Sequence, residues 1–195
     1  METYKNIQKK TSETFNKFQK KYDSEMNCQK GCSRCCIDGI SIFSWEAAII
    51  TDWYFNLSPE EKEKWIKNQS LPSSSHMPFV DNEGTDNVPC LFLRDDKCSI
   101  YDSRPSVCRT QGMSILIRED SHYFRDWCPL NFVDRKTQGF EDNENPTPEQ
   151  KDDLNLETLN ELLASAQIFY EKEMPESLGP RRVLLKDIWH YLIKA

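Results

Sequence analysis

Eight cysteines are the residues of this 195-residue chain best suited to chemistry, and they fall into two groups. The groups are spaced Cys28-x3-Cys32-x2-Cys35-Cys36 and Cys90-x7-Cys98-x9-Cys108-x19-Cys128. Thiolates bind borderline and soft metals, and short spacers let one backbone segment wrap an ion without large strain. Four plus four ligands suit two tetrahedral sites or one polynuclear cluster. The adjacent pair Cys35-Cys36 favours two coupled centres, because neighbouring side chains tend to point apart.

Disulfides and buried core thiols are the alternatives to metal binding. The N-terminal residues show neither an apolar export segment nor a small-residue cleavage site, so we expect a cytoplasmic protein, whose thiols are kept reduced. A chain of this length can also form a core without covalent staples. Metal binding is therefore the favoured interpretation, although the wide spacing of the second group also suits small buried thiols.

Basic residues are interleaved with the cysteines and would offset the negative charge of metal-bound thiolates. They are Lys30, Arg34, Arg94, Lys97, Arg104 and Arg109. We predict that Arg104 and Arg109 donate hydrogen bonds to the sulfurs and so help to bind the cofactor. Surface pairing with Asp102 or Asp126 is the alternative for these two side chains.

The joint pattern resembles the YkgJ-like cysteine-cluster proteins, which are described as zinc- or iron-chelating domains and are often labelled iron–sulfur-cluster proteins. The matching motifs are the Cys28 to Cys36 spacing, Pro89-Cys90-Leu-Phe-Leu93, Cys98-Ser-Ile-Tyr101-x2-Arg104-Pro105-x2-Cys108-Arg109, and Cys128. The resemblance covers residues 28–128. It implies that all eight cysteines are metal ligands, and it leaves zinc and iron equally open.

Three regions must position these ligands. Residues 1–22 carry apolar side chains at spacings of three and four, which predicts an N-terminal amphipathic helix. Residues 23–140 form the predicted cysteine-cluster domain, and residues 141–195 an acidic, helical region packed on the same domain. The expected fold is therefore a small mixed α+β domain, mostly helical, with short strands around the cluster and flanking amphipathic helices.

Local signals predict individual elements within these regions. We expect a strand at 40–43, a helix at 45–56 capped by Ser44, and a helix after Ser58, whose capping-box partner is Glu61. A loop should follow at 71–89, then a hairpin at 90–101, a helical turn near 103–109 and an extended segment at 113–117. Apolar periodicity predicts two further helices at 149–173 and 181–193.

Composition restricts the function classes. The net charge of −7 and the pI near 5.1 disfavour general nucleic-acid binding, which needs an excess of Lys and Arg. No apolar run is long enough for a membrane span. The expected partners are a metal ion and a protein that exchanges electrons or metal with this one.

Three hypotheses for the function remain. The first is an iron–sulfur or other metal protein with a role in electron transfer or metal handling, and the second is a structural zinc module for protein interaction. The third is an enzyme, because Cys28-x3-Cys32-x2-Cys35 has the spacing of the radical S-adenosylmethionine signature and resembles the cysteine cluster of flagellin lysine methylases. We assign no catalytic residues, since His76, His122 and His190 lack the spacing of a Cys-His pair; His122 alone is near the cluster in sequence.

Overall fold

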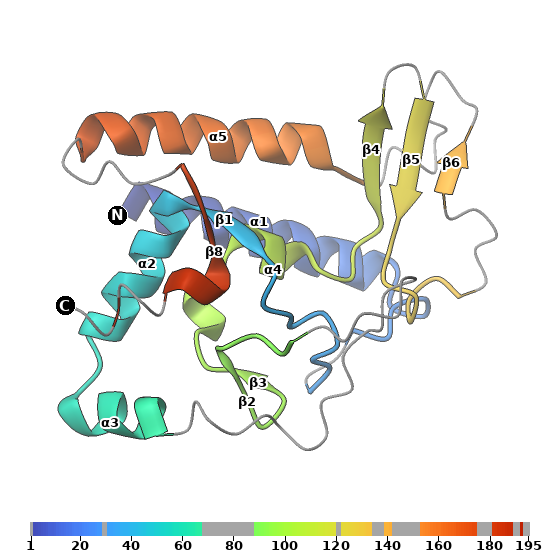
Figure 1. The fold of residues 1–195 in the computed structure, drawn as a ribbon. Coiled ribbons are helices and arrows are strands. Elements are labelled where there is room, and N and C mark those ends of the chain that lie inside the picture. The colour runs from blue at the N-terminus through green and yellow to red at the C-terminus, as the bar shows by residue number, and fades with distance from the viewer. Residues whose placement is uncertain are drawn as a thin grey trace.

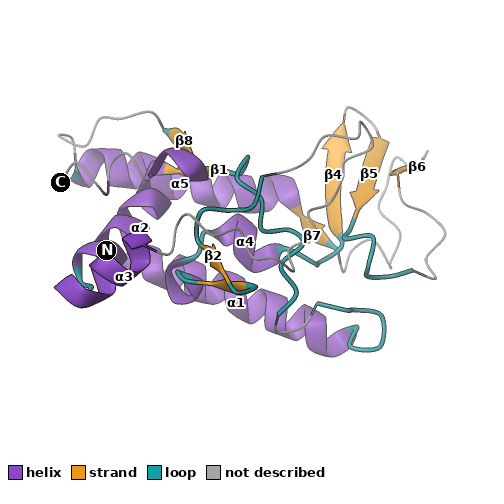
Figure 2. Cartoon of the chain, turned by 60° about the horizontal axis from the view of Figure 1, so that its bottom comes forward, coloured by secondary structure: helices purple, strands orange, loops and turns teal. Residues whose placement is uncertain are grey.

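The computed structural model describes residues 2–28, 31–67, 88–119, 122–133, 139–141, 153–174, 181–188 and 192. Their fold is α+β and mostly helical, with short strands in small sheets, as the sequence predicts. Long helices lie side by side over much of the molecule, while strands β4 and β5 stand at one end, away from α2 and α3 (Figures 1 and 2).

Three helices form a core that contains no cysteine. They are α1 (Glu2–Lys21), α2 (Ser44–Phe55) and α5 (Leu156–Glu173). Helix α1 forms because its apolar residues recur on one face, which buries Tyr4 and Phe18 as predicted. The ring centroid of Tyr4 lies 5.5 Å from that of Trp45 and 5.8 Å from that of Tyr170, so one tyrosine joins all three helices.

A second core lies beneath α2 and contains α3 (Pro59–Lys67) and the hairpin of β2 (Leu93–Arg94) and β3 (Lys97–Cys98). Helix α3 begins with the predicted capping box, in which the Glu61 N–H donates to Ser58 Oγ and the Ser58 N–H donates to Glu61 Oε2. Trp65 from this helix stacks on Phe92 beside the hairpin. The predicted hairpin is confirmed, although only two residues on each side pair.

The remaining sheets join segments that are distant in sequence. Strand β1 (Ser41–Phe43) pairs antiparallel with β8 (Arg182–Leu184). The larger sheet has the order β6-β5-β4-β7, with β4 (Ile115–Glu119), β5 (His122–Asp126), β6 (Gly139–Glu141) and β7 (Leu154–Asn155). Strand β7 runs parallel to β4 and leads directly into α5.

Short helical turns complete the described elements. The turn η2 (Tyr101–Ser103) and helix α4 (Ser106–Thr110) follow the hairpin, and η5 (Leu185–Asp187) follows β8. Helix α4 begins directly after Pro105 and contacts α1. It carries Cys108 and, in its last turn, Arg109.

Three predicted details are wrong. Residues 182–187 form a strand and a 3-10 turn instead of the start of a helix at 181–193, because β1 offers this segment a pairing edge. Helix α5 begins at Leu156 and not at residue 149, and Leu162 and Phe169 are exposed although the apolar periodicity places them on the buried face. Ser44 is the first residue of α2 and not its cap; its hydroxyl donates to Gln167 on α5.

Residues 71–87 of the predicted loop lie outside the described residues.

Within the described part of the chain, no helix is both long and apolar enough to cross a membrane.

Candidate metal centre

All eight cysteines are half-buried free thiols, and loops and short elements carry them. The first four lie between α1 and β1. Cys90 and Cys98 belong to the hairpin region, Cys108 lies on α4, and Cys128 follows β5. The long helices thus act as a scaffold, and the chain between them supplies every thiol.

Cys28 lies against residues more than eighty positions later in the chain. Asn131 Nδ2 donates to Cys28 Sγ at 3.3 Å and to the Gly112 carbonyl at 2.7 Å, while the Asn27 N–H donates to Asn131 Oδ1 at 2.8 Å. Asn131 is fully buried, so these contacts are shielded from water. One asparagine therefore fixes Cys28 beside the end of α4.

Gly112 makes this approach possible. Its φ of +95° is in the left-handed region that glycine tolerates at little cost. A Cβ atom at this position would overlap Cys28 Sγ and also lie 3.2 Å from Asn131 Nδ2. The absence of a side chain at Gly112 thus creates the space in which the Cys28 sulfur sits.

Cys28 and Cys128 interact directly. A hydrogen bond between the two thiols raises the pKa of Cys28 and lowers the pKa of Cys128, the partner that carries the negative charge. The backbone N–H groups of Leu130 and Asn131 and the charge of Arg34 lower the pKa of Cys128 further. Two cysteines that are 100 positions apart in sequence therefore share one local site.

The rest of the first cysteine segment is hydrogen-bonded to the start of the second group. The Cys90 N–H donates to the Cys36 carbonyl at 2.8 Å, and the Asp38 N–H donates to the Val88 carbonyl at 3.0 Å. Ser33 Oγ lies 2.9 Å from Asp96 Oδ1 in the hairpin turn. These contacts bring the Cys35-Cys36 pair next to the hairpin. Within the pair, a thiol–thiol hydrogen bond and burial raise the pKa of Cys35.

Cys90, Cys98 and Cys108 form a third neighbourhood. Burial raises the pKa of Cys90 to about 11 and also raises the pKa of Cys98. Burial is the largest cause of the raised pKa of Cys108, and the nearby sulfurs of Cys90, Cys98 and then Cys35 raise it further. These shifts arise chiefly because burial disfavours the charged thiolate, and at Cys90 and Cys108 also because other sulfurs lie nearby.

Backbone donors recur at these sulfurs with one spacing. In three cases the N–H of the residue two positions later hydrogen-bonds the sulfur: Phe92 to Cys90, Ile100 to Cys98, and Leu130 to Cys128. Hydrogen bonds of this kind stabilise the thiolate form, which is the form that binds metal. Each of these three cysteines thus has a local backbone turn suited to an anionic sulfur.

Three arginines lie near the third neighbourhood, that of Cys90, Cys98 and Cys108. The charge of Arg94 lowers the pKa of Cys90, and the charges of Arg104 and Arg109 lower that of Cys98. Arg94 Nε and Nη2 and Arg104 Nε are buried and have no hydrogen-bond partner among the described residues. Buried guanidinium donors of this kind suit an anionic metal–thiolate centre.

Arg109 has a further structural role, because its guanidinium connects α4 to α1 and to η2. It donates to Ser12 Oγ at 2.8 Å, to Gln8 Oε1 at 3.4 Å, and to the carbonyls of Asp102 and Arg104. Its role as a donor to the sulfurs stays a prediction, as does that of Arg104, whose guanidinium lies 3.9 Å from the Tyr101 ring centroid.

Glu46 positions α4 from the other side. Its carboxylate accepts from the Ser106 N–H at 2.7 Å and from the Phe43 N–H at 3.1 Å, so one side chain joins the starts of α4 and α2. Burial of this carboxylate raises the pKa of Glu46, and the two backbone donors oppose that shift. Sequence reasoning missed Glu46, Gly112 and Asn131, since only the tertiary structure brings them to the site.

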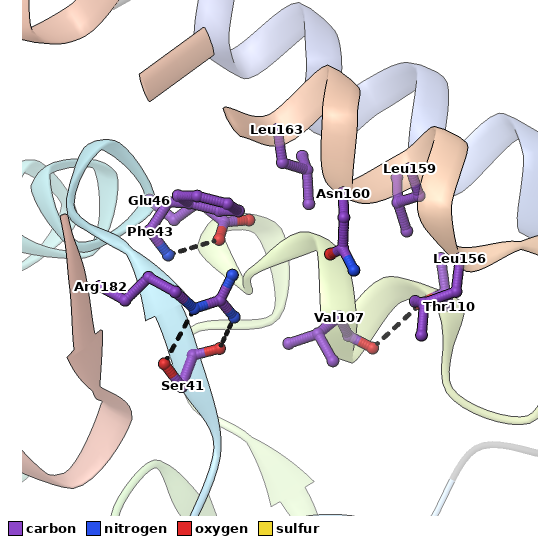
Figure 3. A pocket seen from close by; sticks show the side chains of 10 residues that line it. All are labelled: Ser41, Phe43, Glu46, Val107, Thr110, Leu156, Leu159, Asn160, Leu163 and Arg182. Carbon is purple, nitrogen blue, oxygen red and sulfur yellow. Dashed lines mark hydrogen bonds between the residues drawn. The ribbon is translucent and has the colours of Figure 1, made fainter. Parts of the chain in front are cut away.

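A pocket of about 230 Å³ lies next to this junction, between β1, α4, α5 and β8 (Figure 3). Glu46 and Arg182 are its charged lining residues. Both are held by contacts within the fold: Arg182 donates to Ser41 Oγ at 3.1 Å and to the Ser41 carbonyl at 2.9 Å. No described cysteine lines this pocket, so it is separate from the thiol sites.

The thiols suit a metal by their chemistry, whereas the described structure does not arrange them as a closed metal site. Among the described residues, no three Cys, His, Asp or Glu side chains are arranged to hold an ion as they stand. The thiols instead lie in neighbouring sets, with backbone N–H donors at some of the sulfurs and arginine charges close enough to lower the pKa of Cys98 and of Cys128. His76, His190 and Lys30 lie outside the described residues, and His122 is placed only as part of β5.

Comparison with known proteins identifies the cysteine region. Residues 27–129 match the family model CxxCxxCC, which is described as a putative zinc- or iron-chelating domain. The match includes all eight cysteines and slightly more than half of the chain. No curated protein and no solved structure matches the chain.

Proposed function

The chain belongs to the CxxCxxCC family, and on that premise we propose that its eight cysteines bind zinc or iron as thiolates in two coupled centres. The observation that carries the proposal is the N–H donor two residues after Cys90, Cys98 and Cys128. A donor at this position favours the anionic sulfur, which is the ligand that these metals need.

Charge in the site supports the same proposal. Eight thiolates carry more negative charge than two divalent ions neutralise, so nearby cations stabilise the bound state. Arg94 and Arg104 have buried donors without partners in the described structure, and Arg34 lies close enough to Cys128 to lower its pKa. The protein's own residues thus orient the thiols and balance their charge.

The biological role that suits such a site is electron transfer or metal handling in the cytoplasm, with a protein redox or metal-transfer partner. An iron–sulfur centre supplies one-electron chemistry when it is bound, and thiolate-bound zinc supplies structural stability. Both kinds of centre carry a net negative charge that the buried arginines can balance. We place the redox role first and the structural zinc module second.

The test is the metal and acid-labile sulfide content of untagged protein, purified anaerobically from cells supplied with both iron and zinc. Brown protein that contains iron and sulfide would support the redox role. Colourless protein with about two zinc ions would support the structural role. Protein that contains no metal and has few free thiols would overturn the proposal in favour of disulfides.

A further inference from the structure

We infer that the eight cysteines divide between the two centres by tertiary contact and not by their grouping in the sequence. Cys128 joins Cys28 and Cys32 in a first centre, and Cys90, Cys98 and Cys108 form the second. The pair Cys35-Cys36 lies between them and supplies one thiolate to each. This inference rests on the proposed function and adds the ligand set of each metal.

The first centre is defined by the hydrogen bonds between residues 27–28 and 130–131. Asn131 receives the Asn27 N–H and donates to Cys28 Sγ, and the Asn131 N–H donates to the Cys128 carbonyl at 2.8 Å. The loop after Cys128 is therefore attached to Cys28, and the two sulfurs are hydrogen-bonded partners. Cys32 follows Cys28 by four positions in the loop between α1 and β1, and its charge raises the pKa of Cys28, so we assign it to the same centre.

A small apolar core fixes this loop and the end of α1 together. Phe18 on α1 lies 6.0 Å from Phe132, ring centroid to centroid, and Phe132 lies 6.0 Å from Trp127. The Phe132 N–H donates to the Glu25 carbonyl at 2.8 Å. Because Cys28 and Cys128 are each joined to this core by short segments, their proximity is a property of the packed fold.

The second centre is built on the hairpin and α4. Leu93 pairs with Cys98, and the Leu93 N–H donates to the Cys90 carbonyl at 2.9 Å, so the hairpin brings Cys90 and Cys98 together. Glu46 holds the first turn of α4 through the Ser106 N–H, which sets the position of Cys108. The charges of Cys90 and Cys98 are the largest sulfur effects on Cys108.

The adjacent pair connects the two sets. The Cys36 carbonyl accepts from the Cys90 N–H, which attaches the pair to the second centre. Cys35 interacts electrostatically with Cys128 and also with Cys108, one member of each set. The thiols of Cys35 and Cys36 are hydrogen-bonded to each other, so the pair adjoins both sets and can supply one thiolate to each metal.

The test uses the native, zinc-loaded protein, so that it does not depend on variants that fold. A chelator removes the metal in steps, a maleimide labels each thiol as it is released, and mass spectrometry locates the labels. We expect two phases, in which Cys28, Cys32 and Cys128 become reactive together and Cys90, Cys98 and Cys108 become reactive together. Labelling of Cys128 in the phase of Cys90 would overturn the partition, and so would release of all eight thiols in one phase.

Serine variants provide an independent count of zinc per chain. We expect Cys28→Ser, Cys128→Ser and the Cys28→Ser/Cys128→Ser double variant to retain one zinc each, because all of them remove the same site. Cys98→Ser/Cys128→Ser should retain none. The opposite result for the two double variants would overturn the partition. Wild-type protein that binds no zinc and no iron would instead overturn the proposed function, so the two failures are distinguishable.

Discussion

At the scale of single residues, the site depends on Gly112, because glycine has no Cβ atom to occupy the space of the Cys28 sulfur. Gly112 combines a positive φ with a close approach to Cys28 Sγ, whereas Gly31 has a positive φ of +96° in open space and Gly39 has neither constraint. Comparing these three glycines therefore separates the cost of a positive φ from the cost of a clash with the Cys28 sulfur.

We predict graded losses for alanine at these positions. Gly39→Ala should change the free energy of unfolding little, and Gly31→Ala should cost about 1–2 kcal/mol because of its φ. Gly112→Ala should cost about 1–3 kcal/mol more, since its Cβ displaces the Cys28 sulfur. Urea unfolding of the metal-loaded variants measures these differences. Equal stability of the Gly31 and Gly112 variants would show that the contact with Cys28 has no energetic role.

Tyr4 gives the molecule a dependence on alkaline pH. It donates to Glu173 Oε2 at 2.8 Å, and burial and then that carboxylate raise the pKa of Tyr4 from 10 to about 12. In the unfolded chain the phenol loses its proton near pH 10, so its contribution to stability is complete below pH 10 and is lost as the pH rises to 12.

Tyr4→Phe should therefore reduce the fall in stability between pH 10 and pH 12. At neutral pH the variant should lose about 1 kcal/mol, because one hydrogen bond is removed. Thermal unfolding at several pH values measures both effects. An identical alkaline slope in the variant and the wild type would contradict the assignment of this slope to Tyr4.

At the scale of elements, a buried ion pair joins the β-sheet to α5. Arg125 Nε in β5 lies 2.6 Å from Asp153 Oδ2, and the two side chains are 4% and 1% exposed. Asp153 directly precedes β7, which pairs with β4 and leads into α5. The pair therefore fixes where the helix leaves the sheet.

Asp153→Asn should destabilise the protein by about 3–5 kcal/mol, since it leaves the Arg125 charge buried without its counter-ion. The matched control is Glu63→Gln in the exposed pair of Lys67 and Glu63, whose side chains are 70% and 66% exposed. That change should cost less than about 1 kcal/mol. Similar losses for the two variants, measured by chemical unfolding, would contradict the role given to burial.

The difference between local signals and tertiary contacts explains which elements could be predicted from the sequence. Helices α1 and α3 were predictable because apolar periodicity and a capping box are local signals. The apolar spacing at residues 182–188 also fits a helix, but pairing with β1 decides its structure. For the site, the eight candidate ligands were readable from their spacing, whereas the contact between Cys28 and Asn131 has no local signal and depends on packing over 103 positions.

At the scale of the whole molecule, the cores differ in their dependence on metal. The core of α1, α2 and α5 contains no cysteine, whereas Cys90 and Cys98 pack against the core beneath α2. Metal removal should therefore loosen the chain between the cysteines before it affects the three long helices.

Hydrogen exchange of chelated protein tests this expectation. We predict faster exchange at residues 31–38, 88–100 and 122–132 and retained protection in α2 and α5. The N-terminal half of α1, packed through Tyr4, should follow α2 and α5. An exchange pattern that is unchanged by chelation would contradict a structural contribution from metal.

The contact between Cys28 and Asn131 has a further consequence during synthesis of the chain. The two residues are 103 positions apart, and ribosomes add about 5–20 residues per second, so Cys28 precedes its partner by an interval on the order of 5–20 s. Cys90 and Cys108 emerge much closer together. A nascent chain thus completes the surroundings of Cys28 only after all eight cysteines have been added, and until then the Cys28 thiol is open to oxidants and to competing metals.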